Sequence, residues 1–207
     1  MKMLIDGEGS FSARGTIKDN YPVPTTFTSK IVSSAETSDV TMVLDEGNVK
    51  ELETAPLPSR DLVPVTEANR QGITDPLTAM LFSTAATGEG LSRDTCRHTL
   101  PIFDGRHRYD LKLAFKRIDQ VATVKGYTGL VVVCSVKYEP IAGHRASTPL
   151  IRYLSEGREM EVALGPDCRY EAAVAIPGVG GQHARRFSNR SQSIRSHFTA
   201  RGRFHSC

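Results

Sequence analysis

The residues of this chain that could do chemistry gather in and near one stretch, CRHTLPIFDGRHRYDLKLAF. The candidate metal ligands are a thiol, three imidazoles and a carboxylate: Cys96, His98, His107, His144 and Asp104. Structural zinc sites favour close pairs such as Cys-x-x-Cys or His-x-x-x-His, and neither pair is present. Cys96 and His98 would share one face of a strand, but this spacing alone does not define a ligand set. We predict no metal site.

A nucleophilic thiol is the other chemistry that these residue types allow. Cys96 with His98, or Cys134 with His144, would form a thiolate and imidazole pair. Such a pair needs a third group to orient the imidazole, or surroundings that activate the thiol, and the sequence shows neither. We therefore predict a non-enzymatic protein with no catalytic residues and no cofactor. A thiol- or metal-dependent enzyme that uses Cys96 and Cys134 is kept as an alternative.

The four cysteines of the chain allow three full pairings. A bridge between Cys96 and Cys134 would stabilise the fold by about 4 kcal/mol if loop-closure entropy dominates its effect. It would also indicate an oxidising compartment. Alternatively, both are unpaired buried thiols that pack as small apolar groups, which suits Cys134 between Val132 and Val136. The residues alone leave both alternatives open.

Length and composition indicate one globular domain, with or without a tail. The chain has 207 residues, of which 39% are hydrophobic and 24% charged, and this length can bury a core without metals or disulfides. Its longest apolar runs fall far short of the roughly 18 to 20 residues that a membrane span requires. We expect no membrane-spanning segment.

Charge is distributed unevenly along the chain. Beyond residue 167 the sequence has many Arg residues, no Lys and one acid, Glu171, whereas the part before it is mildly acidic. Arg alternates there with Phe187, Phe198 and Phe204, which would allow phosphate attraction and base stacking. Nucleic-acid binding through this end is therefore an alternative function. A disordered, solvated end is favoured instead because the segment has few apolar residues and no sustained period, so nucleic acid is not expected as a partner.

Alternation with a period of two dominates the body of the chain. The alternating segments are rich in Val, Ile, Thr, Tyr and Phe and are bounded by turn residues, which predicts mainly antiparallel β structure: they are 10–18, 25–34, 38–44, 106–116, 129–140 and 158–164. Asp104 and Gly105 form a strong turn signal, so residues 95–116 are predicted to form one hairpin. Residues 53–66 contain three prolines and are predicted to be an extended connection.

One segment has helical rather than strand periodicity. In TDPLTAMLFSTA, Thr74 or Asp75 can cap a helix, Pro76 suits its first position, and Leu77, Met80 and Leu81 share a face. This predicts a short helix over about 75–84. A lone helix among strands must bury its apolar stripe against the concave face of the sheet.

Four motifs occur in order along the chain: VPVTEANRQGITDPLTAMLF, CRHTLPIFDGRHRYDL, YTGLVVVCSVKYEPIAGHR and REMEVAL. Together they resemble the domain of unknown function 3108 family of bacterial envelope proteins, found chiefly in proteobacteria. The resemblance covers residues 1–164. It implies a periplasmic protein with a curved antiparallel sheet, an open or spiral half-barrel, wrapped around one short α-helix, similar in outline to carriers of lipoproteins and lipids. It brings no established activity. It also implies that Cys96 pairs with Cys134.

Two parts of the chain depart from this family pattern. The start lacks an apolar export signal, which predicts a cytoplasmic protein if the start is genuine, and we expect the first strands of the domain to be missing. We expect residues 1–164 to form the β-rich domain. Residues 165–207 are expected to be a basic tail, disordered or the aberrant product of a frameshift.

The combined expectation is an uncharacterised, non-enzymatic protein of the periplasm or cell envelope. Its curved sheet would bind a hydrophobic ligand, a lipid or a partner peptide. The groove or core is predicted to consist of inward-facing apolar and aromatic residues of the helix and sheet: Leu77, Leu81, Tyr109, Leu111, Leu113, Phe115, Val132, Val136 and Tyr138.

Overall fold

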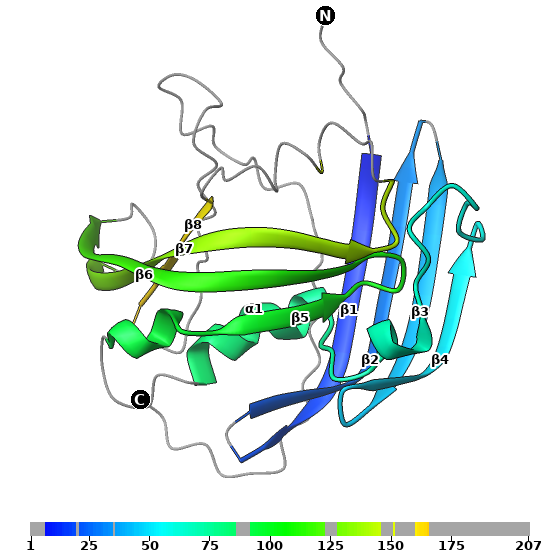
Figure 1. Cartoon of the computed structure of the whole chain (residues 1–207). Coiled ribbons are helices and arrows are strands. Elements are labelled where there is room, and N and C mark those ends of the chain that lie inside the picture. The colour runs from blue at the N-terminus through cyan, green and yellow to red at the C-terminus, as the bar shows by residue number, and fades with distance from the viewer. Residues whose placement is uncertain are drawn as a thin grey trace, which may run out of the picture.

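The computed structural model contains two antiparallel sheets with a helix between them (Figure 1). It describes residues 7–19, 21–34, 36–85, 92–122, 128–145, 151 and 160–165. The predicted basic tail therefore lies outside the described residues, apart from Gly165.

Each sheet has four strands in sequence order. The first consists of β1 (Gly7–Lys18), β2 (Tyr21–Ser33), β3 (Thr37–Asp45) and β4 (Asn48–Ala55). The second consists of β5 (Thr99–Phe103), β6 (Arg108–Ala122), β7 (Thr128–Ala142) and β8 (Met160–Leu164). The helical elements are α1 (Pro76–Ala85) and two short 3-10 helices, η1 (Glu67–Arg70) and η2 (Arg93–Cys96). In Figure 1, β5, β6 and β7 run across the direction of the first sheet's strands.

Strand β4 was not predicted, because a bulge breaks its alternation. Leu44 pairs with Val49 and Met42 pairs with Leu52, so the register skips Lys50. Val49 and Leu52 therefore both pack on the core of the first sheet, although a spacing of three residues would place them on opposite faces of a regular strand. A two-residue turn at Glu46 and Gly47, both with positive φ, joins β3 to β4. The predicted connection at 53–66 consequently begins only after Ala55.

The predicted hairpin over 95–116 is present in its central part. Phe103 pairs with Arg108 across the turn that Asp104 and Gly105 begin. Cys96, however, lies in η2 and not in a strand, which corrects the prediction for that residue. A bulge at Lys116, which the register between β6 and β7 skips, ends the simple alternation that follows Tyr109.

Helix α1 begins where the sequence predicts. The Asp75 carboxylate accepts hydrogen bonds from the backbone N–H groups of Leu77 and Thr78, at 2.9 and 3.0 Å, and so caps the helix. The predicted apolar stripe is only partly correct, because Met80 is 56% exposed. Among the helix residues whose burial is described, the buried ones are the smaller Thr78 and Ala79, which allow the helix to approach its neighbours closely. Leu77 packs on the core of the first sheet and Ala79 on that of the second.

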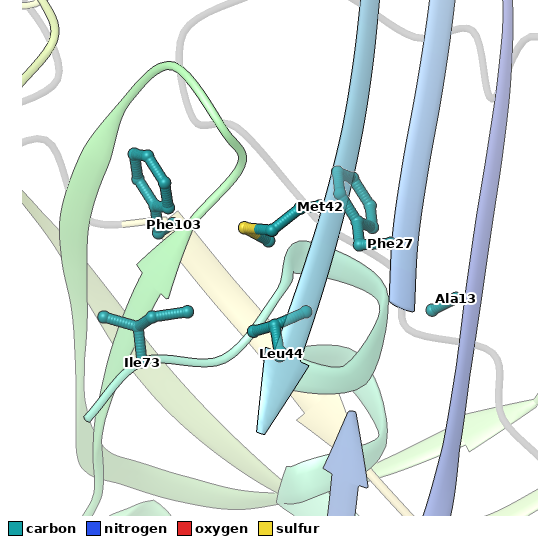
Figure 2. Packing of buried hydrophobic residues seen from close by; sticks show 6 residues of the cluster. All are labelled: Ala13, Phe27, Met42, Leu44, Ile73 and Phe103. Atoms are coloured by element: carbon teal, nitrogen blue, oxygen red, sulfur yellow. The ribbon is translucent and has the colours of Figure 1, made fainter. Parts of the chain in front are cut away.

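The core of the first sheet contains residues from outside that sheet. Ala13, Phe27, Met42 and Leu44 supply its strand side, and Figure 2 shows Phe103 and Ile73 facing them. The backbone between the elements is also joined: the Ile73 N–H donates to Gly47 O at 2.8 Å, and the Phe103 N–H donates to Thr74 O at 3.0 Å. The segment before α1 thus links the β3–β4 turn to β5.

The predicted fold class is confirmed. The described residues form a mainly antiparallel β structure without a closed barrel, and α1 is the α-helix whose full extent is described. The strands are divided between two sheets, and the helix packs on the cores of both. Among the helices described here, none is long and apolar enough to cross a membrane.

Candidate functional site

A disulfide joins Cys96 of η2 to Cys134 of β7. The S–S distance is 2.02 Å and the Cα atoms lie 5.4 Å apart. Both cysteines are fully buried, in a cluster with Val132 and Leu164. The pairing implied by the family resemblance is therefore present in the structure, and neither sulfur is a free thiol.

The histidines considered as metal ligands or bases lie in separate surroundings. The backbone carbonyl of His98 accepts a hydrogen bond from the Leu113 N–H at 2.9 Å, and that of His144 accepts one from the Val63 N–H at 2.9 Å. His107 binds Asp104. Within the described ranges, no group of three or more His, Cys, Asp or Glu side chains could hold a metal ion.

The turn between β5 and β6 holds a carboxylate and imidazole pair. Asp104 Oδ1 accepts hydrogen bonds from the backbone N–H groups of Arg106 and His107, at 2.8 and 2.6 Å, and Oδ2 lies 3.0 Å from His107 Nδ1. Burial alone would raise the pKa of the Asp104 carboxyl, but its contacts with His107 and the two N–H groups hold that pKa below its usual value. The hydrogen bond and charge of Asp104 raise the pKa of His107.

This pair is expected to make stability depend on pH. The contribution of His107 is complete below its unfolded pKa of 6.5 and is lost as pH rises through the raised folded value. The contribution of Asp104 is complete above its unfolded pKa of 3.8 and is lost as pH falls through the lowered folded value. The pair therefore contributes most to the free energy of unfolding at pH values between 3.8 and 6.5.

Urea unfolding of wild type and His107→Gln at pH 5.5 and pH 8.5 tests this expectation. The wild type should exceed the variant in free energy of unfolding by a larger margin at pH 5.5 than at pH 8.5. Asp104→Asn should show the same trend, although it also weakens the two backbone contacts. Equal margins at both pH values would show that the pair does not carry the dependence.

An apolar pocket of about 240 Å³ lies between α1 and the second sheet. Helix α1 contributes Ala79 and Met80, β5 contributes Leu100 and Ile102, and β8 contributes Met160 and Val162; Tyr109, Leu111, Leu113, Val136, Pro76 and Glu161 complete the lining. Nearly all of these residues are apolar. The pocket can therefore bury hydrocarbon, but it offers few groups that could act on a reacting bond.

The nine predicted groove residues do not all lie in one place. Tyr109, Leu111, Leu113 and Val136 line the pocket. Phe115 and Val132 pack around the disulfide instead, and Leu77 packs on the first core. The Tyr138 ring lies 5.1 Å from that of Tyr109, centroid to centroid, and Leu81 is half-buried on α1.

Several lining residues were not predicted, although a signal for some of them exists. Leu100 and Ile102 alternate along β5, with Leu100 opposite Leu111 and Ile102 opposite Tyr109 in the hairpin. The hairpin register alone therefore places them beside predicted lining residues. Met160 and Val162 could not be placed in this way, because the pairing of β8 with β7 depends on the tertiary fold.

Glu161 is the charged residue among the described lining residues, and its charge is compensated. Its carboxylate lies 3.0 Å from Arg117 Nη2 and 2.9 Å from Lys116 Nζ. The hydrogen bond with Arg117 has the largest effect and the one with Lys116 adds to it, so that the pKa of Glu161 is lowered to about 2. Glu161 therefore stays ionised and paired at neutral pH, and it does not supply a proton to the pocket.

Comparisons with known proteins place the chain in a family. Searches of curated proteins and of solved structures each found no match. A family model, DUF3108, described as a protein of unknown function, matches residues 1–176. This range includes all the described strands, both cysteines of the disulfide and the apolar pocket. The chain therefore belongs to the DUF3108 family.

Proposed function

We propose that this chain is a non-enzymatic protein of the periplasm or cell envelope that binds one hydrocarbon chain, such as the acyl chain of a lipid, between α1 and the second sheet. The observation that carries the proposal is the lining of the pocket. Ala79, Leu113, Val136 and Val162 come from three strands and the helix and converge on one space. Each methylene group that leaves water for such surroundings gains about 0.8 kcal/mol.

The size of the pocket supports a single chain as the occupant. Its volume of about 240 Å³ is below the range of about 300–1,000 Å³ that is typical of pockets for drug-sized ligands. An unbranched chain fits such a space more readily than a fused ring system or a peptide helix. Met80, which lines the pocket and is 56% exposed, marks the side from which a chain could enter.

The disulfide supports the proposed compartment. Disulfides persist in oxidising environments such as the bacterial periplasm and are rare in the cytosol. It also weakens the thiol-enzyme alternative, because Cys96 and Cys134 are bonded to each other and fully buried. The nucleic-acid alternative depends on the basic tail, which is outside the described residues.

A tryptophan at position 80 provides the test, because the chain contains no tryptophan of its own. Titration of Met80→Trp with 1-octanol should give a saturable blue shift of the emission, since the indole lies beside the hydrocarbon in the occupied pocket. Ile17→Trp is the matched control: Ile17 is also exposed, at 42%, but lies outside this pocket. It should show no saturable shift with 1-octanol.

Substitutions that fill the pocket complete the experiment. Adding Ala79→Phe or Val162→Phe to the Met80→Trp chain should weaken 1-octanol binding at least tenfold, because the ring occupies the space of the chain. Circular dichroism and thermal melting identify a variant that does not fold, in which case the other one decides. The proposal is overturned if the Met80→Trp emission does not respond to 1-octanol. It is also overturned if a variant with Ala79→Phe or Val162→Phe folds and binds 1-octanol as tightly as Met80→Trp alone.

A further inference from the structure

A second cavity, of about 430 Å³, lies between β4 of the first sheet and the β5–β6 turn of the second. Leu52 of β4, Phe103 of β5 and Val65 of the intervening connection give it apolar walls, and Leu57 stands at its edge. Leu57 is 83% exposed, which makes it the most exposed of the large apolar side chains described. Two arginines, Arg70 and Arg106, also line this cavity. It shares no residue with the pocket beside α1.

The guanidinium of Arg106 is only partly hydrogen-bonded. Its Nη2 donates one hydrogen bond, to the carbonyl oxygen of Pro56 at 2.8 Å. Its Nε is buried without a hydrogen-bond partner, and in the described part of the chain no carboxylate forms an ion pair with it. A partly desolvated guanidinium without an acidic partner is unfavourable, and an anion in the cavity would remove that cost.

Of the other charged residues that line the cavity, Arg70 is paired with an acid and Glu53 is exposed. Arg70 Nη1 lies 3.1 Å from Glu67 Oε1, which neutralises that pair, yet Arg70 Nε is also buried without a partner. Glu53 lines the cavity from β4 and is exposed to solvent, where its charge is screened. Arg106 is therefore the lining cation that has no described acidic partner, and apolar side chains lie beside it.

We propose that this cavity binds a small organic carboxylate with an apolar body. The body would contact Leu52, Val65 and Leu57, and the carboxylate would accept hydrogen bonds from Arg106, with Arg70 adding positive charge. Guanidinium groups present planar N–H donors that match a carboxylate and form short, strong hydrogen bonds with it. The volume of about 430 Å³ lies within the range of about 300–1,000 Å³ typical of small-molecule sites. This site is independent of the proposed acyl-chain pocket.

The full chain carrying Leu57→Trp is the reporter for this site. Titration with octanoate at pH 7.5 should give a saturable emission shift. 1-Octanol, which has the same number of carbons but no charge, should bind at least tenfold more weakly. Inorganic phosphate, which has charge but no apolar body, should not displace octanoate. Equal responses to octanoate and 1-octanol, or displacement by phosphate at equal concentration, would overturn the proposal.

Substitution of the arginine separates this site from the acyl-chain pocket. Arg106→Gln in the Leu57→Trp chain should raise the dissociation constant of octanoate at least tenfold. Arg97→Gln, at an arginine that is exposed and outside both sites, should leave it unchanged. The Met80→Trp response to 1-octanol should survive Arg106→Gln, so each proposal can fail without the other. An unchanged octanoate affinity in Arg106→Gln contradicts the assignment of Arg106.

Discussion

The double variant Cys96→Ala/Cys134→Ala is expected to lose about 4 kcal/mol in free energy of unfolding relative to the oxidised wild type. The disulfide spans 38 residues, and removing it restores the loop-closure entropy of the unfolded chain. It also connects η2 to β7 beside the buried Val132 and Leu164. Alanine is the better replacement, because serine would bury an unpaired hydroxyl group at either position.

Equilibrium unfolding in urea measures this effect. Wild type with a reducing agent should lose a similar amount of stability, since the covalent link is then also absent. Cys168→Ala/Cys207→Ala is the control, because it removes the other two cysteines and retains the disulfide. A Cys96→Ala/Cys134→Ala chain within about 1 kcal/mol of the oxidised wild type would show that the bridge does not stabilise the fold as the chain-entropy argument requires.

Gly143→Ala is expected to lower the free energy of unfolding by about 3 kcal/mol or more. Gly143 follows β7 with φ of +82°, and a Cβ atom there would lie 1.9 Å from the carbonyl oxygen of Arg106. That oxygen belongs to the backbone of the β5–β6 turn and cannot rotate away. The glycine therefore permits β7 to end against the turn that carries Arg106.

Gly72→Ala is the matched control for this prediction. Gly72 also has positive φ, +62°, but a Cβ atom there would meet nothing within 4 Å. Its substitution should cost only the conformational penalty of about 1 kcal/mol. Urea unfolding of both variants gives the comparison. Equal losses in the two variants would mean that the contact with Arg106 is relieved by movement of the turn.

The local elements could largely be predicted from sequence, because they depend on patterns within short segments. Alternation predicts β3 and β7, and Asp75 with Pro76 predicts the start of α1. Strand β4 was missed because the register skips Lys50, which places Val49 and Leu52 on the same core. A bulge changes the period without any residue type that identifies it.

The division into two sheets could not be predicted in this way. It depends on contacts between segments distant in sequence, such as the backbone bonds from Ile73 to Gly47 and from Phe103 to Thr74. Nothing in the local pattern shows that Phe103, on a strand of the second sheet, completes the core of the first. The prediction of a mainly antiparallel β structure around a short helix is therefore correct, but the strands form two sheets where one curved sheet was expected.

The candidate sites depend on the same long-range arrangement. Alternation correctly groups Tyr109, Leu111 and Leu113 on one face, and all three line the pocket beside α1. It extends the same face to Phe115, which instead packs around the disulfide next to the β6 bulge. The cavity that contains Arg70 and Arg106 was not predicted, since its walls come from β4, the following connection and the β5–β6 turn.

Mass spectrometry of organic extracts from the purified full chain tests the central claim most directly. The chain should be produced with export to a bacterial periplasm, so that it meets envelope lipids in an oxidising compartment. Wild type is predicted to release a lipid or fatty acid in an amount approaching one per chain, and folded Ala79→Phe is predicted to release much less. Extracts of wild type without bound hydrocarbon, or equal amounts from both proteins, would contradict the acyl-chain pocket.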